Sequence, residues 1–485
     1  MTGALDALAG TAVGVYALAT AVLAGLGLHA LALAVVRSVR PARPLPAPAP
    51  TTWPSLVVQL PVYDEPAALV ARALDAACAL RYPGRVEVQL LDDSGPAARR
   101  ANAVLCAERH PAVRHVVREG REGYKAGALA HGLRQTDAAL AAVFDVDFQP
   151  APDALVRLVP ALLADDALAF VQAPWTHPEA DATALGRAQA ALLDLHFAVE
   201  QGARDRAGWP LVFNGTAGVW RVAAVVDAGG WEGDTLAEDL DLALRAQARG
   251  WRARLAEAVP VAADLPPTVS AWRRQQARWA KGLAEVARKD LGVLWRSGVS
   301  LPGRLALTAH TALSLSLPAL LVVVVLHPIV ALASALGLGP GPGVFAALAG
   351  GYVGLGGLAV AHGVAQRALY PASWGRRLVH VPLAFLAPLV LVLPAARGVA
   401  EAALGQRTPF LRTPKAGGAL EPGGGEAALA VYAAAGAVVL AVAGAWAALA
   451  FQTLLAVGLA GAAVAVRQRP AMTVKAVTQP VRTAA

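Results

Sequence analysis

Long apolar runs lie near both ends of the chain and flank a central region in which short apolar stretches alternate with polar ones. The first run, residues 11–36, is long enough to span a bilayer, which requires about 20 apolar residues. Further long runs occupy residues 305–336, 344–365, 378–396, 427–447 and 448–466. The pattern therefore predicts a membrane protein in which a large polar domain is inserted between membrane-spanning helices.

The central region, residues 55–267, has the pattern of an α/β domain. Its short continuous apolar runs are typical of buried strands, and the Ala-rich segments between them have helical periodicity. Strands that alternate with helices indicate a mostly parallel sheet, covered by helices on both faces and linked by right-handed crossovers. We expect strands at residues 56–60, 86–91, 113–117, 139–144 and 168–171, and helices at residues 66–80, 97–108, 125–134 and 153–163.

Two segments are expected to connect this domain to the apolar regions. Residues 1–40 contain the first span and its basic flank, and the proline-rich residues 41–54 predict an extended, semi-rigid spacer. After the domain, residues 268–300 have an amphipathic pattern that combines Trp272 and Trp279 with interleaved arginines and lysines. Such a helix suits the bilayer interface, whereas a surface helix of the polar domain is the plainer interpretation.

Basic residues predict the side of the membrane on which the domain lies. The first span is followed by Arg37 and further arginines and preceded by none, which places the N-terminus outside and the domain in the cytoplasm. Within the membrane region, residues 301–470, the run at 378–396 is broken by prolines, so we expect a re-entrant or interfacial segment there and five full spans. A sixth span, or a hairpin within residues 305–336, is the alternative. The basic tail at residues 471–485 is then cytoplasmic.

The composition agrees with a membrane protein. Of the 485 residues, 56% are hydrophobic and only 16% are charged, with a net charge of +8. Acidic residues are concentrated between Asp64 and Asp290, whereas basic residues lie beside the apolar runs. This distribution predicts contact with membrane lipids and not with nucleic acid, and the chain has no zinc-ligand cluster or RNA-binding signature.

Carboxylates follow successive strands of the predicted sheet. They are Asp64-Glu65, Asp92-Asp93, Asp145-Val146-Asp147 and, at the start of a later helix, Glu238-Asp239. Because the carboxyl ends of parallel strands meet at one edge of a sheet, we expect these side chains to line one cleft. There they can read a base and ribose, hold a divalent cation and act as a general base. Any one of them alone is more often a helix cap.

Eight motifs in this order resemble a known family. They are Pro61-Val62-Tyr63-Asp64-Glu65, Leu91-Asp92-Asp93-Ser94, Gly123-Tyr124-Lys125-Ala126-Gly127-Ala128-Leu129, Asp145-Val146-Asp147, Phe213-Asn214-Gly215-Thr216-Ala217-Gly218, Ala237-Glu238-Asp239, Gln275-Gln276-Ala277-Arg278-Trp279 and Phe410-Leu411-Arg412-Thr413-Pro414-Lys415. The chain resembles the processive, membrane-integrated glycosyltransferase family 2 enzymes, which include cellulose, hyaluronan and chitin synthases, and above all their mannan and glucan synthase-like branch. The resemblance implies a GT-A-type sheet domain.

The resemblance also implies roles for individual residues. Asp145 and Asp147 would hold Mg²⁺ or Mn²⁺ on the donor diphosphate, and Asp239, beside Glu238, would take the proton of the acceptor hydroxyl. The implied donor-binding residues are Tyr63, Asp64, Asp93, Lys125, Asp145, Gln275, Arg278, Thr413 and Lys415, the last two in a gating loop near residues 405–415. The implied acceptor-binding residues are Trp279, Asn214, Gly215, Thr216 and Trp175. By itself, His177 reads as an ordinary loop residue.

The resulting hypothesis is an inverting, metal-dependent hexosyltransferase of the cytoplasmic (plasma) membrane. It would transfer sugar from a nucleotide sugar to a growing β-linked polysaccharide, and the multiple spans suggest that synthesis is coupled to export. Non-processive transfer to a lipid acceptor, which gives a glycolipid, is one alternative. A transport protein with a degenerate glycosyltransferase domain is another. The motifs do not identify the sugar.

Overall fold

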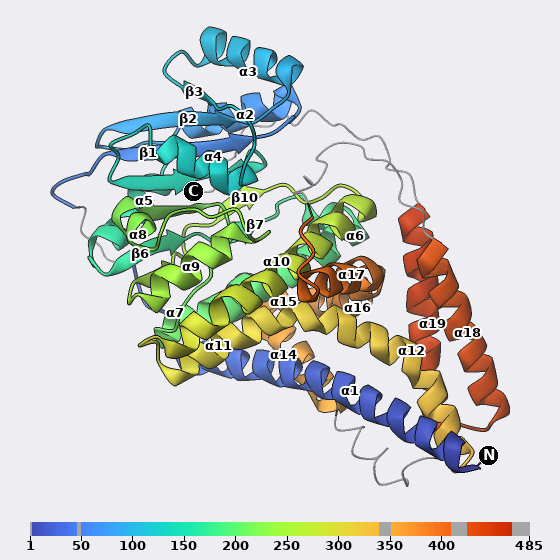
Figure 1. Cartoon of the computed structure of the whole chain (residues 1–485). Coiled ribbons are helices and arrows are strands. Elements are labelled where there is room, and N and C mark those ends of the chain that lie inside the picture. Colours follow the sequence, from blue (N-terminus) through green and yellow to red (C-terminus); the bar gives the residue numbers. More distant parts are fainter. Residues whose placement is uncertain (1, 46–49, 339–350, 409–423, 468–485) are drawn as a thin grey trace.

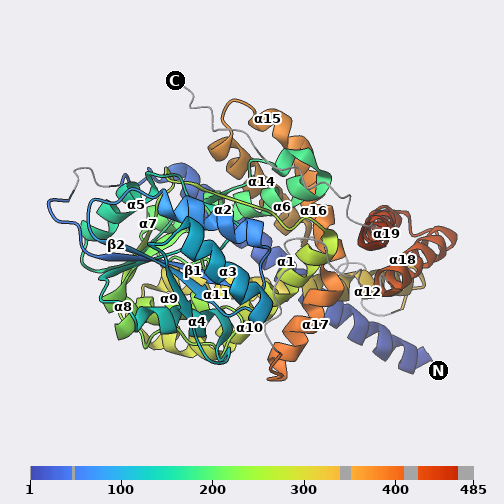
Figure 2. The same cartoon turned by 90° about the horizontal axis from the view of Figure 1, so that it is seen from above.

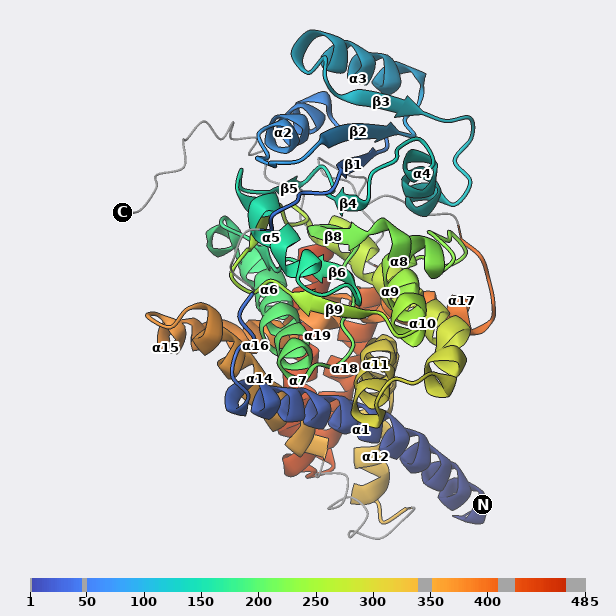
Figure 3. The same cartoon turned by 90° about the vertical axis from the view of Figure 1, so that its left-hand side faces the viewer.

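The computed structural model describes residues 2–45, 50–338, 351–408 and 424–467. A sheet domain lies at one end of the molecule and a group of long apolar helices lies at the other (Figures 1 and 3). Helix α10 (Val269–Arg296) lies between them and packs against helices of both parts. The predicted insertion of a polar domain between apolar helices is therefore confirmed.

The main sheet has seven strands in the order β3-β2-β1-β4-β8-β6-β9. Neighbouring strands are parallel except those beside β8, which runs antiparallel to β4 and β6. The strands are β1 (Leu56–Val62), β2 (Val86–Asp92), β3 (Arg114–Val117), β4 (Leu140–Val143), β6 (Leu168–Gln172), β8 (Gly218–Arg221) and β9 (Arg252–Leu255). A small second sheet contains β5 (Phe148–Gln149), β10 (Val261–Ala263) and β7 (Trp175–Thr176). The mostly parallel sheet and its five expected strands are confirmed, whereas the sequence did not indicate β8 and β9.

Helices cover both faces of the main sheet, as expected. Leu74 of α2 and Leu158 of α5 belong to an apolar cluster on one face, and Leu129 of α4 and Leu242 of α9 belong to a cluster on the other. Each of these buried leucines contributes about 1.5–3 kcal/mol of hydrophobic stabilisation. The helices of the sheet domain are α2 (Ala67–Cys78), α3 (Pro96–Arg109), α4 (Tyr124–Leu133), α5 (Ala154–Leu163), α8 (Val222–Asp227) and α9 (Glu238–Ala248).

A continuous helical segment leads from the sheet domain toward the apolar helices. It consists of α6 (Ala184–Asp194), the π-helical turn η2 (Leu195–Gln201) and α7 (Gly202–Ala207), after a short 3₁₀ turn η1 (Ala180–Ala182). The η2 turn packs against both α1 and α14. This segment therefore joins the sheet domain to the apolar helices.

Four helices in the described ranges are long and apolar enough to cross a membrane: residues 4–39, 301–335, 424–442 and 446–467. A fifth crossing would be made by the segments on either side of residue 391, which bend by 55°. The elements are α1 (Thr2–Val39), α11 (Leu301–Ala312), η3 (Leu313–Leu315), α12 (Ser316–Ala335), α14 (Gly351–Leu369), α15 (Trp374–Arg377), η4 (Leu378–His380), α16 (Val381–Leu386), η5 (Ala387–Val390), α17 (Val392–Ala403), α18 (Gly424–Val442) and α19 (Trp446–Arg467). Helices α18 and α19 pack against each other at one edge of the molecule (Figure 2).

The predicted break in the run at residues 378–396 is present as this bend, but whether the segment crosses the membrane stays a prediction. The predicted span at 344–365 begins outside the described residues, and its remainder lies in α14. The count of five full spans therefore also stays a prediction. The tail at residues 471–485 lies outside the described residues.

The amphipathic helix expected after the sheet domain is present as part of α10. Its Trp272 ring is only 3% exposed and packs with Val390 and Leu391, and Arg273 is paired with Glu426 at 2.5 Å. These two side chains therefore face the other helices of the protein and not lipid headgroups. The prediction of a helix is confirmed. Trp272 and Arg273, however, are buried against other parts of the protein.

Small residues allow α1 and α14 to approach each other closely. A Cβ atom at Gly354 would lie 2.4 Å from Ala24 Cα, and one at Gly27 would lie 2.0 Å from the Gly354 carbonyl oxygen. Contact between the helix backbones therefore depends on glycine at both positions, as is common where membrane helices pack.

We expect Gly354→Ala to lower the thermal unfolding temperature of the purified protein by several degrees, because overpacking at such a contact costs about 1–3 kcal/mol. Gly356→Ala is the matched control, since a Cβ atom there meets no atom within 4 Å. Unfolding in detergent, followed by intrinsic fluorescence, measures both. Equal unfolding temperatures for the two variants would contradict the packing described here.

Candidate active site

A cleft opens at the carboxyl-terminal edge of the main sheet, beside the first residues of α4 and α9 and against α10. This is the edge at which the sequence predicted that carboxylates would gather. The predicted residues that line the cleft are Tyr63, Asp93, Lys125, Asp145, Asp147, Trp175, Asn214, Gly215, Glu238, Asp239, Gln275, Arg278 and Trp279. Asp64 and Thr216 do not line it, and Thr413 and Lys415 lie outside the described residues.

The Asp145-Val146-Asp147 segment begins one residue beyond Phe144, which follows the buried strand β4. Val146 is only 2% exposed, so the apolar residue between the two aspartates is held in the core. The backbone N–H of Asp145 donates a hydrogen bond to Thr216 Oγ1 at 2.8 Å. Thr216 therefore fixes the backbone of Asp145. This positioning contact differs from the role at the acceptor that was expected for Thr216.

Lys125 is the central cation of the cleft. Its ammonium donates to Asp145 Oδ1 at 2.6 Å and to the Gly215 carbonyl at 2.9 Å. Burial lowers the pKa of Lys125, but the carboxylates of Asp145 and Glu238 outweigh this effect and raise it. The side chain is therefore a firmly charged ammonium beside the predicted metal pair, and its expected contact with the nucleotide stays a prediction.

The turn into α4 brings Lys125 to this place. Gly123 has φ of 68°, a conformation that favours glycine. A Cβ atom at Gly127 would lie 2.0 Å from the Glu122 carbonyl oxygen, so the first turn of the helix can close only over glycine. The glycines of the predicted motif thus set the backbone that carries Lys125.

Glu238 and Asp239 are the first residues of α9. Burial and the adjacent Glu238 charge raise the pKa of Asp239 to about 7, although Lys125 acts in the opposite direction. Gly215 lies directly against this carboxylate, since a Cβ atom there would be 2.7 Å from Asp239 Oδ2. A carboxyl group with a pKa near neutrality has the property required of a general base at physiological pH.

Helix α10 supplies one wall of the cleft. Its N-terminus is capped by Thr268, whose hydroxyl accepts from the Ala271 N–H at 3.1 Å. Gln275, Arg278 and Trp279 are three and four residues apart and therefore share one helix face. Burial lowers the pKa of Arg278, with Glu238 and Asp239 opposing this effect, and a guanidinium remains charged under any physiological condition.

Two arginines that the sequence analysis did not identify organise the part of the cleft near Tyr63 and Asp93. Arg118 makes a bidentate pair with Asp93 at 2.8 and 2.7 Å and also donates to the Tyr124 carbonyl. The Arg121 guanidinium lies 3.3 Å from the centroid of the Tyr63 ring. Asp93 therefore fixes the loop before α4. The sequence did contain a signal for these two residues, because both are basic and lie in the loop between β3 and the motif that begins at Gly123.

Asp64 differs from expectation in its placement, and His177 lies closer to the proposed chemistry than a loop position alone indicates. Asp64, at φ of 49°, accepts from the Gly95 N–H at 2.8 Å, and its own N–H donates to Ser94 Oγ. It thus ties two strand-end loops together beside the cleft, and its donor-binding role stays a prediction. His177 is a loop residue, as expected, and it also lines the cleft, where its Nδ1 bonds to the Ala263 carbonyl.

Asp145 and Asp147 fit a divalent cation by the chemistry of their donor atoms. Mg²⁺ and Mn²⁺ prefer oxygen ligands, and carboxylates at the edge of a sheet are common ligands beside a diphosphate. Lys125 and Arg278 line the same cleft and could bind phosphate oxygens. The arrangement can therefore bind a nucleoside diphosphate and cation next to a base, Asp239.

Two family profiles match the chain. The profile "Glycosyl transferase family 2" matches residues 57–213, and the profile "Glycosyl transferase family group 2" matches residues 142–358. Between them they include the sheet domain, α10 and the first apolar helices that follow it.

Characterised relatives are found among plant enzymes. The chain is 40% identical over 247 residues to glucomannan 4-beta-mannosyltransferase 2 of Arabidopsis thaliana, a match covering 49% of the chain and 46% of that protein. It is also 40% identical over 249 residues to glucomannan 4-beta-mannosyltransferase 1 of Oryza sativa subsp. japonica, covering 50% and 48%. The chain thus spans about half the length of the curated relatives it matches.

A solved structure shares the fold. It is the mannosyltransferase PcManGT from Pyrobaculum calidifontis in complex with GDP-Man and Mn2+, with a TM-score of 0.53 and 24% sequence identity. The match covers 78% of this chain and 99% of that one. The predicted GT-A-type α/β fold is therefore confirmed.

We expect Asp147→Asn to weaken binding of Mn²⁺ by roughly tenfold or more, because an amide replaces a charged oxygen ligand. The amount of free Mn²⁺, measured by electron paramagnetic resonance, reports the affinity. Asp64→Asn is the control, since Asp64 does not line the cleft and an amide oxygen can still accept from the Gly95 N–H. An unchanged affinity for Asp147→Asn would rule out a cation site at this residue.

Proposed function

We propose that this chain, which belongs to the family 2 glycosyltransferases, transfers a hexose from a nucleotide sugar to a β-linked polysaccharide at a membrane. The observation that carries the proposal is the cleft itself. It brings the Asp145 and Asp147 pair, the half-buried cations Lys125 and Arg278 and the high-pKa carboxyl of Asp239 to one place. A degenerate domain would have no physical reason to keep these groups together, because grouping buried charges is costly.

Mannose is the proposed sugar, with GDP-mannose as the donor. The relatives are named as glucomannan 4-beta-mannosyltransferases, and the structure with the same fold is a mannosyltransferase in complex with GDP-Man and Mn2+. By this likeness the product would be a β-1,4-linked mannan or glucomannan.

The donor would lie between the sheet edge and α10. Asp145 and Asp147 would hold a divalent cation, which when bound neutralises the diphosphate and stabilises the departing nucleoside diphosphate. Lys125 and Arg278 would bind phosphate oxygens, and the planar guanidinium is well suited to do so. Tyr63 and Asp93 line the part of the cleft beside the Arg121 loop, where the base and ribose are proposed to bind.

Asp239 would accept the proton of the acceptor hydroxyl as its oxygen attacks the anomeric carbon. The bond from that carbon to the diphosphate oxygen breaks in the same displacement, so an α-linked donor gives a β-linkage. Trp279 and Trp175, which line the cleft, would offer flat faces to acceptor sugars.

The proposal includes passage of the product into the membrane region. Helix α10 lines the cleft with one face and packs against α17 with another, so the acceptor end adjoins the apolar helices. A second cavity lies among these helices, lined mainly by apolar side chains together with Tyr16, His327 and Trp446. We place the sheet domain on the cytoplasmic side of the plasma membrane.

The rate of transfer should depend on the ionisation of Asp239. Only the ionised carboxylate accepts a proton, and its pKa is about 7, so kcat should rise with pH through about 7 and fall roughly tenfold per pH unit below it. Glu238→Gln removes a charge that raises this pKa, so its acidic limb should move to lower pH. Asp239→Asn should abolish transfer but keep donor binding, measured by calorimetry. An acidic limb that stays in place in Glu238→Gln would contradict this assignment.

A panel of radiolabelled nucleotide sugars tests the donor and the product. We expect the purified protein with Mn²⁺ to transfer label from GDP-mannose into an insoluble polymer that β-mannanase degrades. Label that partitions into organic solvent would instead indicate a lipid acceptor. In sealed vesicles with outward-facing sheet domains, polymer protected from added mannanase would support export. Absence of transfer from every donor, unaffected by Asp239→Asn, would contradict the enzymatic proposal.

A further inference from the structure

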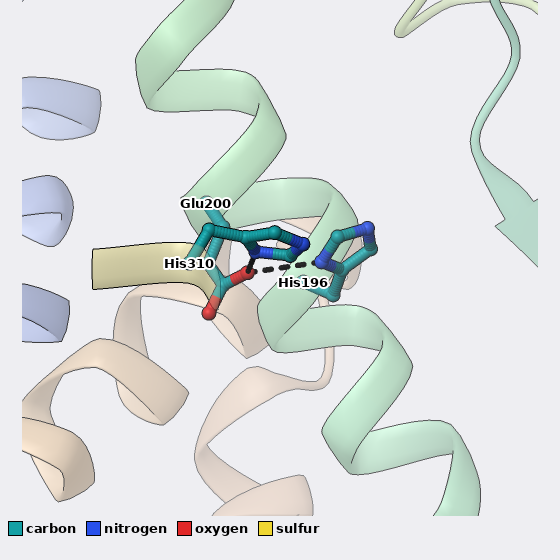
Figure 4. Close-up of side chains that lie close together, drawn as sticks. All are labelled: His196, Glu200 and His310. Carbon is teal, nitrogen blue, oxygen red and sulfur yellow. Dashed lines mark hydrogen bonds and ion pairs between the residues drawn. The ribbon is translucent and has the colours of Figure 1, made fainter. Parts of the chain in front are cut away.

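A buried polar cluster lies where the sheet domain meets the apolar helices. His196 and Glu200 belong to the π-helical turn η2, and His310 comes from α11 (Figure 4). Only 9% of Glu200 and 8% of His310 is exposed. Turns of this kind replace regular helix frequently at functional sites. The cluster has no part in the proposed chemistry, yet it contacts a residue of the cleft.

The contacts form a chain that ends at the cleft. His196 Nδ1 lies 2.9 Å from Glu200 Oε2, and His310 Nδ1 lies 3.6 Å from the same oxygen. On its other side, His196 Nε2 lies 2.9 Å from Asn214 Nδ2. Asn214 lines the cleft beside Gly215. The imidazole therefore bridges a buried carboxylate and an amide of the proposed acceptor site.

Backbone groups fix which atom donates and which accepts along this series of side-chain hydrogen bonds. The Val212 N–H donates to Gln201 Oε1 at 3.2 Å, so the Gln201 amide nitrogen is the group that donates to the Val212 carbonyl at 2.7 Å. The same nitrogen donates to Asn214 Oδ1 at 3.1 Å. The Asn214 oxygen therefore faces Gln201, and its NH₂ group faces His196.

The tautomer of His196 follows from this order. Because Asn214 presents a donor, His196 Nε2 has to be the acceptor, and the ring proton is on Nδ1, where it donates to Glu200. Burial alone would raise the pKa of Glu200, but the hydrogen bond from His196 and the nearby His310 ring lower it well below its ordinary value. Glu200 is thus an ionised acceptor, and Arg204, which is fully buried, balances its charge.

A metal ion is the other occupant that two histidines and a glutamate suggest, and zinc accepts this donor set. A metal on His196 Nδ1 would leave the ring proton on Nε2, directly opposite the NH₂ group of Asn214. Two donors would then face each other at 2.9 Å. Arg204 would also add its charge to that of the ion. The hydrogen-bond chain therefore favours a proton over a metal at Nδ1.

We infer that His196 is a positioning residue that holds the amide of Asn214 for a hydroxyl group of the acceptor sugar, and that Glu200 selects the tautomer this requires. With its oxygen and one N–H engaged by Gln201 and His196, Asn214 keeps its second N–H for an oxygen of the acceptor. This inference rests on the proposed function, because it assigns Asn214 to the acceptor.

Two substitutions separate the two hydrogen bonds of His196. His196→Gln reaches the position of Nε2, so its oxygen can accept from Asn214. The side chain in His196→Asn reaches only the position of Nδ1. It can therefore donate to Glu200, but the hydrogen bond to the Asn214 amide is lost. With a soluble β-1,4-manno-oligosaccharide as acceptor, we expect His196→Gln to keep the acceptor KM within about twofold. His196→Asn should raise it about tenfold, the effect of one neutral hydrogen bond.

The donor side provides the control. The KM for GDP-mannose and the hydrolysis of donor by water should be unchanged in both variants, and thermal unfolding should show that both are folded. In the Asn214→Ala background, His196→Asn should have no further effect on the acceptor KM, as expected for residues that act through one contact. Equal acceptor KM values for the two His196 variants, or fully additive effects, would overturn the inference.

A measurement that does not depend on enzymatic activity separates this inference from the proposed function. Nitrogen chemical shifts of ¹⁵N-histidine in the full chain report the tautomer of His196, and we expect the proton on Nδ1. A proton on Nε2, or stoichiometric metal that is lost in His310→Gln, would overturn the inference even if transfer is observed. If the wild-type protein transfers no sugar but His196 has the expected tautomer, the proposed function fails and the positioning of Asn214 stands.

Discussion

Helix α10 has to satisfy buried charges on more than one face, and the rest of the architecture depends on this constraint. Arg278 lines the cleft, whereas Arg273 pairs with Glu426 of α18 and Lys281 pairs with Glu401 of α17. Breaking a buried pair leaves an uncompensated charge and costs about 3–5 kcal/mol. The cleft wall and the apolar helices are therefore held as one unit, so a shift of the membrane helices would move the wall of the cleft.

The pattern of buried and charged positions also explains which parts of the fold could be predicted from the sequence. Strands β1, β4 and β6 are almost wholly buried and therefore appear as mainly apolar runs. Strands β8 and β9 do not, because Arg221 and the alternating arginines of β9 interrupt the pattern. Their place is set by pairing with β4 and β6, which are distant in sequence. Trp272 was read as an interface anchor because an amphipathic pattern does not reveal whether lipid or protein covers its apolar face.

The cleft was predictable to the extent that strand ends determine it. Residues such as Asp145 and Asp239 follow a strand or begin a helix at one edge, so topology alone brings them together. Topology does not determine which way a side chain turns. Asp64 stands at the same edge but accepts from the Gly95 N–H. Arg118 and Gln201 act through contacts with residues 25 and 13 positions away along the chain, which no local pattern encodes.

The different roles proposed for Asp145 and Asp239 follow from the positions of the neighbouring charges. Lys125 donates to Asp145, so this carboxylate keeps a compensated charge at the place proposed for the diphosphate and its cation. Asp239 has Glu238 as its neighbour and is partly removed from water, and both effects raise its pKa to about 7. Groups in one cleft whose environments differ in this way take different roles in acid–base chemistry. Gly215 makes this possible, because its carbonyl accepts from Lys125 while its missing side chain leaves room for Asp239.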